Sequence, residues 1–361
     1  MILFRPTYLT HILVKHQIWP RVTPAVTIFP PVTTTQTSSH RLVSREQQPK
    51  SYSRRTKLRS IIELMRWHKP TGTLLTLSPA LWSVAMATPA TDSYPDLKTM
   101  AIFTAGAVAA RGIGCTINDI LDRKYDRLVE RTKMRPIACG DITVKEAVLY
   151  LAIQSTIGLY ILCLNNLAVI KLGLFSGIMI ATYPLFKRFT YWPQVMLGLT
   201  FNWGVLMGYA AIKGGIYYDD LGAIIPLYLG ANLWTLYYDT IYAHQDKADD
   251  KFIGVKSSAL RLGDDTKKFL NTMSGVMFLN LALAGLMTDQ LWPYFVSISI
   301  TGLFHAKQVQ NLDLDNLEDC WKAFDQQKYI GLLILCGVIS SVALKSKYKK
   351  PKSPEDPDIV H

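Results

Sequence analysis

The sequence lacks paired cysteines. Its five cysteines are scattered, and none belongs to a CxxC pair. An odd, scattered set argues against a disulfide framework and against the usual zinc-binding spacings. We therefore expect small packing residues at these five positions: Cys115, Cys139, Cys163, Cys320 and Cys336.

Charge is also scarce. Only 18% of the 361 residues are charged, whereas 49% are hydrophobic and the mean hydropathy is +0.16. This composition is too apolar for a soluble domain of this length, so it predicts a membrane protein in a lipid bilayer. The net charge of +12 does not indicate a nucleic-acid partner, because no basic helix or aromatic RNA-binding motif accompanies it.

Acidic residues are nearly missing from the first 60 positions, which hold ten Lys and Arg but a single acid, Glu46. A basic, hydroxyl-rich and acid-poor start is typical of a mitochondrial transit peptide, with an ordinary disordered tail as the alternative. We predict a transit peptide or disordered leader over 1–57, a membrane domain over 58–345 and a polar tail over 346–361.

Nine apolar segments after the leader are long enough to cross a bilayer. They are 73–88, 98–121, 144–164, 167–187, 192–213, 220–243, 268–288, 291–307 and 328–345. Segments 98–121 and 220–243 both end in an acidic cluster and a long basic loop, which suggests two related units facing each other. We predict an all-α, multi-span helical bundle of about nine helices around a central cavity.

The loops differ in charge. Fourteen basic residues fall in loop 122–143, in the turn near 187 and in loop 244–268, which all lie on one side if the nine segments alternate. By the positive-inside rule this side faces the inner compartment, which in a mitochondrion is the matrix. The lysines from Lys345 onward disagree, so either the tail tolerates its charge or segment 291–307 does not cross.

Carboxylates gather where segments 98–121 and 220–243 end. Asp119, Asp122 and Asp126 are spaced i, i+3, i+7, and the run from Asp239 to Asp250 repeats that spacing. Like charges on one helix face repel, so magnesium, which prefers oxygen ligands and keeps positions for phosphates, explains the pattern. The alternative is two solvated helix ends held by salt bridges. A bound diphosphate would also need cations, for which Arg111, Arg131 and Arg135 are candidates, with Lys187-Arg188 as further cations or as a topology anchor.

Five motifs occur in the order found in one enzyme family. They are Asn118-Asp-x-x-Asp-x-x-x-Asp126, Arg131-Thr-x-x-Arg-Pro136, Tyr183-Pro-Leu-x-Lys-Arg188, Tyr191-Trp-Pro-Gln194 with Asn202-Trp-Gly204, and Asp239-x-x-Tyr-Ala-x-Gln-Asp-x-x-Asp-Asp250 with Gly254-Val-Lys-Ser257. Over about residues 60–345 the chain resembles the UbiA-type intramembrane prenyltransferases.

The resemblance implies a helical bundle whose cavity opens to lipid, and a polyprenyl diphosphate bound through Mg²⁺ to both acidic motifs. The implied catalytic residues are Asp119, Asp122, Asp126, Asp246 and Asp250. The implied metal ligands are Asn118, Asp119, Asp122, Asp126, Asp239, Asp246, Asp249 and Asp250. The implied substrate contacts are Arg66, Lys69, Arg111, Arg135, Tyr183, Lys187, Arg188, Asn202 and Tyr242, with Arg66 and Lys69 assigned to the carboxylate of an aromatic acid.

Within that family, the Tyr242–Asp250 run and the leader favour members that prenylate 4-hydroxybenzoate for coenzyme Q. This implies the mitochondrial inner membrane, an active site facing the matrix and possible association with other proteins of coenzyme Q synthesis. A naphthoate, homogentisate or haem acceptor is the alternative within the family. A cation transporter is the alternative outside it, although basic residues beside the acids would repel a passing cation.

Overall fold

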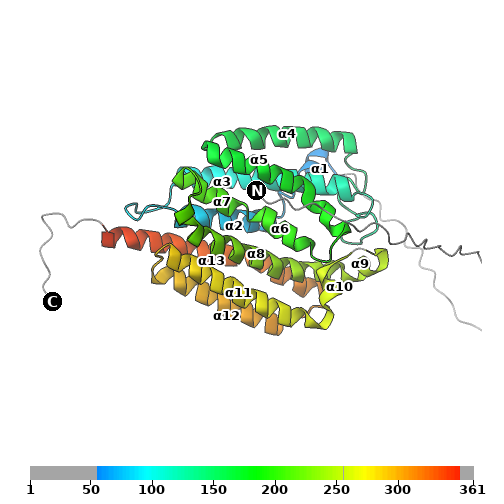
Figure 1. Cartoon of the computed structure of the whole chain (residues 1–361). Coiled ribbons are helices and arrows are strands. Elements are labelled where there is room, and N and C mark those ends of the chain that lie inside the picture. Colours follow the sequence, from blue (N-terminus) through cyan, green and yellow to red (C-terminus); the bar gives the residue numbers. More distant parts are fainter. Residues whose placement is uncertain (1–54, 255, 350–361) are drawn as a thin grey trace, which may run out of the picture. The chain divides into compact units, whose positions relative to one another are not determined.

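The computed structural model describes residues 55–254 and 256–349, together with most of their side chains. Within these ranges the chain forms thirteen α-helices and four 3₁₀-helices, and no strand. Residues 1–54 of the predicted leader and 350–361 of the predicted polar tail lie outside the described residues, whereas 55–57 are described and Lys57 begins α1. Figure 1 shows the long helices side by side, running between two ends of the bundle.

Each of the nine predicted segments is helical. They form α2 (Thr71–Met86), α3 (Leu97–Asp122), α4 (Val144–Cys163), α5 (Leu167–Thr182) with η1 (Tyr183–Arg188), α6 (Pro193–Phe201) with α7 (Gly204–Lys213), α8 (Leu221–Ala243), α11 (Thr266–Met287), α12 (Trp292–Asn311) and α13 (Leu317–Lys349). In the described part of the chain, six of these segments are long and apolar enough to cross a membrane. The predicted all-α, multi-span bundle is confirmed.

Shorter helices cap the bundle. They are α1 (Lys57–Leu64), α9 (Lys247–Ile253) and α10 (Ser258–Leu262), with the 3₁₀ turns η2 (Tyr218–Asp220), η3 (His244–Asp246) and η4 (Gly263–Asp265). They are too short or too polar to give an apolar segment of spanning length, so hydropathy alone does not reveal them.

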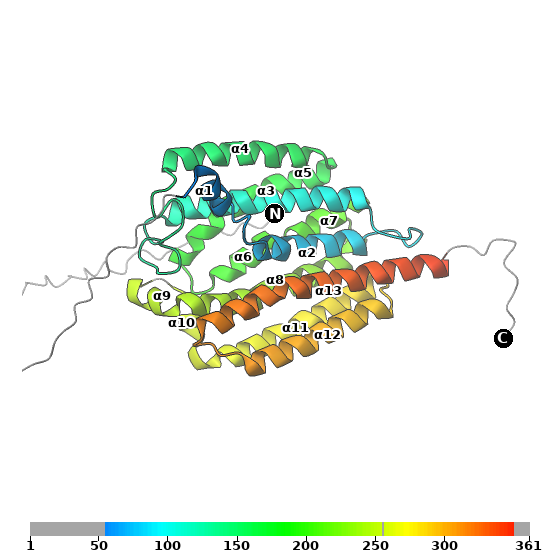
Figure 2. The same ribbon diagram turned by 180° about the vertical axis from the view of Figure 1, so that it is seen from behind.

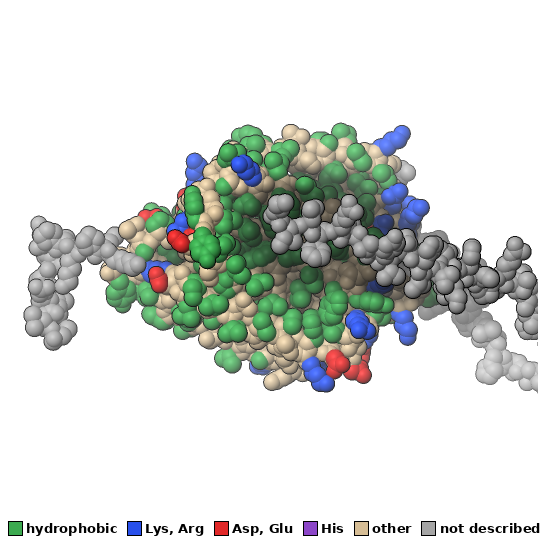
Figure 3. Space-filling model, viewed as in Figure 1, with side chains coloured by type: hydrophobic (Ala, Val, Ile, Leu, Met, Phe, Trp, Pro, Cys, Tyr) green, Lys and Arg blue, Asp and Glu red, His purple; other side chains and the backbone are tan. Residues whose placement is uncertain are grey.

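Helices α2, α8 and α13 form the interior of the bundle. α2 packs against α3, α7 and α13, while α8 packs against α6, α11 and α13. The stacked rings of Trp82 and Trp234, with centroids 5.2 Å apart, join α2 to α8. In contrast, α4 buries little more than Ala147 and Gln154, so most of its surface is available to lipid. The face shown in Figure 3 has a hollow, and hydrophobic side chains border this hollow.

The segment predicted over 192–213 is interrupted. Asn202 and Trp203 separate α6 from α7, and the fully buried Asn202 amide donates to Ala231 O at 3.1 Å and to Thr235 Oγ1 at 2.9 Å on α8. These bonds replace helical contacts with contacts to the neighbouring helix, because a buried amide must be hydrogen-bonded. The break therefore anchors α6 and α7 on α8.

Helix α13 begins at Leu317, whereas hydropathy placed its start near 328. Its first turns carry charges, including Glu318 and Lys322, which form an i, i+4 ion pair at 2.9 Å. Charges lower the hydropathy of a segment, but an i, i+4 pair supports a helix. The extension brings Trp321 and Phe324 to the end of the bundle that holds the acidic motifs.

The position of α12 bears on the two explanations for the lysines from Lys345 onward, and both explanations stay predictions. α12 packs along both α11 and α13 as a full-length helix, and Lys345 donates a hydrogen bond to Thr288 O in the α11–α12 turn. Figure 2 shows the C-terminal end of α13 far from α9 and α10. Segment 291–307 thus runs the length of the bundle, which favours a tail that tolerates its charge.

Helix α1 is clamped to the loop after α3. Arg55 donates to Glu63 at 2.7 Å and to Met134 O at 3.0 Å, and Lys57 pairs with Glu146 at 2.6 Å. The contacts to Met134 and Glu146 reach the middle of loop 123–143 and the first turn of α4. α1 is therefore part of the membrane domain, starting at or before Arg55.

An apolar contact supports this clamp. Leu64 is fully buried and packs in one cluster with Ile137, Ile142 and Ala147. Removing a buried leucine side chain costs about 2–5 kcal/mol, because a cavity remains.

We expect removal of a targeting leader to leave Arg55 and all of α1 in the mature chain. N-terminal sequencing of the protein from mitochondria should give a first residue no later than Arg55. A chain starting after Leu64 should unfold at lower temperature than one starting at Ser53, because it loses the clamp. An equally stable shorter chain would contradict a structural role for α1.

Candidate active site

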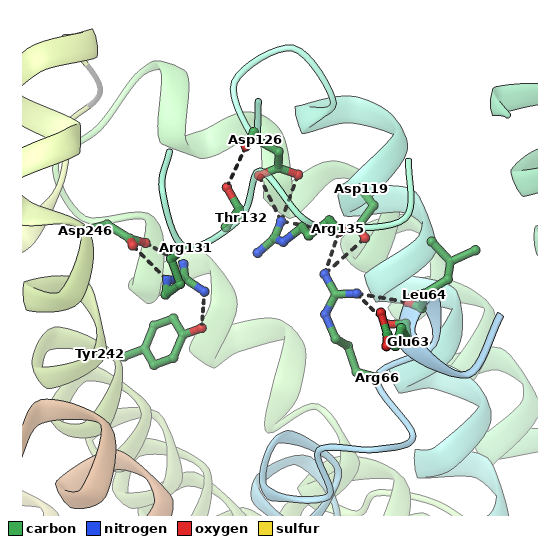
Figure 4. A network of polar contacts seen from close by, with 10 residues as sticks. All are labelled: Glu63, Leu64, Arg66, Asp119, Asp126, Arg131, Thr132, Arg135, Tyr242 and Asp246. Carbon is green, nitrogen blue, oxygen red and sulfur yellow. Dashed lines mark hydrogen bonds and ion pairs between the residues drawn. The ribbon is translucent and has the colours of Figure 1, made fainter. Parts of the chain in front are cut away.

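The two acidic motifs lie at the same end of the bundle. The first occupies the end of α3 and the start of loop 123–143, and the second spans the end of α8, η3 and α9. Figure 4 shows three arginines between them, each facing a carboxylate. The expectation that the two motifs come together is met in the structure.

Arg135 bridges two carboxylates of the first motif. Its Nη1 donates to Asp126 Oδ2 at 2.9 Å and lies 3.3 Å from Asp119 Oδ1. Asp119 and Asp126 are 1% and 6% exposed. Burial raises the pKa of the Asp126 carboxyl above its ordinary value, and Arg135 opposes that rise by stabilising the charged form. Arg135 thus favours the charged form of Asp126.

Arg66 reaches the same motif from the segment after α1. Its Nη2 donates to Asp119 Oδ1 at 2.8 Å and to Oδ2 at 3.0 Å, and its Nη1 donates to Glu63 O at 2.7 Å. The backbone of Arg66 is left-handed, with φ of 58°. A non-glycine residue in this region is strained, and such strain gathers at functional sites. The turn aims the guanidinium at the first acidic motif.

Arg131 joins loop 123–143 to the second motif. Its guanidinium binds both oxygens of Asp246, with Nε–Oδ1 at 2.7 Å and Nη2–Oδ2 at 2.5 Å, and donates to Tyr242 Oη at 2.7 Å. The backbone N–H of Glu130 donates to Asp249 Oδ2 at 3.1 Å. The loop from the first motif is therefore held directly against the second motif.

The remaining predicted metal ligands lie at the same two helix ends. Asn118 is buried near the end of α3, one residue before Asp119. Asp122, Asp239 and Asp250 are half-buried, and each has interactions with its surroundings. All eight predicted ligands thus belong to the segments that meet around Arg131 and Arg135.

The predicted substrate contacts are more widely spread. The Arg188 guanidinium lies 5.8 Å from the centre of the Tyr125 ring, beside the first motif. Tyr183 begins η1, while the side chain of Lys187 lies outside the described residues. The exposed Lys69 amine lies 5.0 Å from the centre of the Trp321 ring on α13. The Asn202 Nδ2 donates to α8, whereas its buried Oδ1 has no hydrogen-bond partner among the described residues.

Arg111 projects from α3 two turns before Asp119. Its guanidinium lies 5.7 Å from the centre of the Phe201 ring and so close to Gly72 that an added Cβ would collide with it. Its Nε is buried without a hydrogen-bond partner among the described residues. A buried cationic donor is costly unless an anion binds it, so Arg111 fits the predicted role in anion binding.

Residues 76–334 match the model of the UbiA prenyltransferase family. The chain belongs to this family. It is 46% identical over 294 residues to a mitochondrial 4-hydroxybenzoate polyprenyltransferase of Caenorhabditis elegans, covering 81% of each chain.

Two solved archaeal structures share the fold of this prenyltransferase. A UbiA homologue from Aeropyrum pernix aligns with a TM-score of 0.64 at 23% identity, over 74% of this chain and 97% of that one. A UbiA homologue from Archaeoglobus fulgidus, bound to GPP and Mg²⁺, aligns with a TM-score of 0.59 at 18% identity, over 79% and 99%. At these identities the likeness concerns the fold.

The carboxylates of this prenyltransferase do not form a metal cage by themselves. Within 55–254 and 256–349, no group of three His, Cys, Asp or Glu side chains is placed to hold a metal ion. Instead, Arg66, Arg131 and Arg135 form ion pairs with the acids. Their partners are Asp119, Asp246 and Asp126, respectively. Mg²⁺, however, usually takes only one or two carboxylates and completes its shell with water and substrate phosphates. Oxygen donors facing each other across one site fit that requirement.

Sequence reasoning missed two aromatic side chains at the site. Phe324 and Trp321 on α13 lie with ring centroids 4.6 and 6.4 Å from that of Tyr242. Their i, i+3 spacing was a signal of an amphipathic helix, but it precedes the apolar stretch that hydropathy detects. With Tyr242 they form an electron-rich wall beside Arg131.

Proposed function

We propose that this prenyltransferase moves a polyprenyl chain from polyprenyl diphosphate to the ring of 4-hydroxybenzoate, in coenzyme Q synthesis. The observation that carries the proposal is the meeting of both acidic motifs at one end of the bundle, with Arg66, Arg131 and Arg135 between them. The 46% identity to the C. elegans enzyme over 81% of the chain supports the choice of acceptor.

The proposed reaction breaks the bond between the allylic carbon and the diphosphate oxygen. The ring carbon ortho to the hydroxyl and meta to the carboxylate then forms a bond to that carbon, and its proton leaves to restore aromaticity. Negative charge grows on the departing diphosphate, and preorganised cations lower the barrier most when they face that charge. Arg131 and Arg135 are placed for this role once phosphate oxygens compete for their guanidinium groups.

Mg²⁺ supplies Lewis-acid stabilisation of the diphosphate when bound. We assign its ligands to oxygen atoms of both motifs, drawn from Asn118, Asp119, Asp122, Asp126, Asp239, Asp246, Asp249 and Asp250. The aromatic side chains of Tyr242 and Phe324 flank the allylic carbon in this proposal, because an electron-rich ring attracts positive charge.

The deciding experiment incubates proteoliposomes with Mg²⁺, a polyprenyl diphosphate and a panel of aromatic acceptors. Mass analysis should detect a prenylated 4-hydroxybenzoate, and chelation with EDTA should abolish the product until Mg²⁺ is restored. If only a naphthoate or a homogentisate gave a product, that compound would be the acceptor instead of 4-hydroxybenzoate. If metal-dependent cation flux occurred without any lipid product, the protein would be a transporter and not this enzyme.

The position of Arg66 leads to a prediction about division of labour. The sequence assigned Arg66 to the acceptor carboxylate, but in the structure both its bonds to a carboxylate go to Asp119. We expect Arg66→Ala to raise KM for polyprenyl diphosphate and to lower kcat, because Asp119 loses its orienting partner. Initial rates with each substrate varied in turn measure this.

Lys98→Ala serves as the control and should leave both constants unchanged, since Lys98 is exposed at the start of α3, at the other end of that helix from Asp119. If Arg66→Ala raises only KM for 4-hydroxybenzoate, Arg66 binds the acceptor carboxylate and its pairing with Asp119 belongs to the free enzyme.

We further propose that the site faces the matrix from the mitochondrial inner membrane. Both basic loops lie at the end of the bundle that holds the acidic motifs, as the positive-inside rule requires of one compartment. Tags inserted near Lys133 and near Asp264 should stay protected from protease in mitoplasts. Cleavage of both tags in mitoplasts would show that the site faces the intermembrane space instead. Association with other proteins of coenzyme Q synthesis stays a prediction from the resemblance.

A further inference from the structure

A small basic pocket lies in the loop between α3 and α4, which we call the loop pocket. Its volume is about 260 Å³, and it is lined by Arg123, Arg127, Ile137, Gly140, Ile142 and the first residues of α4 at Thr143–Val144. The proposed reaction uses none of these residues. Two guanidinium groups over an apolar floor are an unusual lining for a loop that contacts water alone.

The two arginines of the loop pocket have backbone partners. Arg123 Nη1 donates to Ile120 O at 2.7 Å, and Arg127 Nε donates to Ala138 O at 3.0 Å. Within residues 55–254 and 256–349, neither guanidinium pairs with a carboxylate, although acids are plentiful nearby. These bonds position both groups and leave their charge uncompensated.

Acids near the pocket in sequence have other cationic partners. Asp126, which precedes Arg127, pairs with Arg135 at 2.9 Å. Asp141 lies 3.6 Å from Arg55, and Glu146 lies 2.6 Å from Lys57 while also closing the capping box of α4. The residues that line the pocket carry two positive charges and no negative one.

The pocket opens beside a lipid-facing helix. Val144 lines it, and the exposed side chains of Val148, Ala152 and Leu159 continue along the same face of the helix. Only 6% of the residues in the apolar stretch of α4 are buried in the bundle. Figure 1 shows α4 along the outer side of the bundle, with its first residues at the end of the acidic motifs. An acyl chain can therefore lie on α4 while its head reaches the arginines.

We propose that the loop pocket binds the phosphodiester headgroup of an anionic phospholipid, whose acyl chain packs along α4. Basic pockets where membrane helices meet the inner surface suit such headgroups, and each arginine near the surface adds to the attraction. A free phosphate offers the same charge but leaves Val144 and the exposed face of α4 without a partner, so we commit to the lipid.

The bound lipid would act on catalysis through the loop. Arg127 and Ala138 tie together the two ends of the segment that carries Arg131 and Arg135. A headgroup that holds Arg123 and Arg127 restrains this segment where it leaves and re-enters the bundle. We expect turnover in anionic membranes to exceed that in purely zwitterionic membranes.

The test measures lipid binding by native mass spectrometry of the full chain, released from nanodiscs that mix phosphatidylcholine with phosphatidylglycerol or cardiolipin. The Arg123→Gln/Arg127→Gln variant should retain about thirtyfold less anionic lipid. The control Lys124→Gln/Lys145→Gln removes the same charge from exposed neighbours outside the pocket and should retain most of it.

Several outcomes overturn the proposal. They are equal loss in both variants, displacement of the lipid by millimolar inorganic phosphate, and no preference of the unaltered chain for anionic over zwitterionic lipid. Thermal unfolding shows whether the Gln variant is folded. If it is not, the lipid preference of the unaltered chain and the retention by Arg123→Lys/Arg127→Lys decide. This readout needs no catalysis, so it stands apart from the proposed acceptor.

Discussion

Asp246→Ala is expected to lower kcat by about two to three orders of magnitude. Asp246 lies where the second motif meets the loop from the first, and both its oxygens are bound by Arg131. Its loss removes a proposed metal ligand and also frees the arginine that faces the leaving group. Both effects act on charge that develops in the transition state, so kcat falls more than KM rises.

Two variants control this experiment. Asp246→Asn keeps the shape but loses the charge, and it should be nearly as inactive if the carboxylate binds metal. Asp265→Ala removes an exposed acid that pairs with Lys268 at 3.0 Å, and it should leave the rate unchanged. Product formation with saturating Mg²⁺ and both substrates measures the rates. Near-normal turnover of Asp246→Ala would exclude the second motif from catalysis.

The second large effect is expected on stability. Arg135→Ala should lower the free energy of unfolding by about 3–5 kcal/mol, because it leaves buried Asp126 without its cation. Thermal unfolding in detergent measures the change. Lys133→Ala in the same loop is the control, since its pair with Glu130 is exposed and worth at most about 1 kcal/mol.

The deficit of Arg135→Ala should depend on pH. Burial raises the pKa of the Asp126 carboxyl, and loss of Arg135 removes the group that opposes the rise. An acid whose pKa is raised on folding stabilises the protein below that pKa and loses this contribution as pH rises through it. The variant should therefore recover stability in acid. Adding Asp126→Asn should restore stability at neutral pH without restoring activity. If the loss of unfolding free energy were the same at every pH, Asp126 would not be its cause.

Much of this protein was predictable because its signals are local. Apolar segments of spanning length identify helices without any knowledge of their neighbours, since the bilayer sets the length that each requires. The spacing predicts Asp119, Asp122 and Asp126 on one helical face. The structure places Asp119 and Asp122 on α3, whereas Asp126 lies in the loop that follows. The order of five motifs then indicated the family.

Three features were missed because hydropathy and motif order do not encode them. α1 is held by contacts from Arg55 and Leu64 to a loop some 80 residues further along the chain. The start of α13 is stabilised by an ion pair that hydropathy counts as a penalty. Arg66 appeared in sequence as an entry residue for the acceptor, and only the folded chain places it on Asp119.

The sequence by itself determined the helical segments, the family and the identity of the acids, because these follow from composition, periodicity and motif order. The tertiary structure decided which charges meet. The partner of a carboxylate depends on where loop 123–143 returns after α3 and on the clamp by α1, and both rest on contacts between distant residues. For the same reason, only the fold shows that Arg131 and Arg135 pair with the acidic motifs, whereas Arg123 and Arg127 bind backbone carbonyls at the loop pocket.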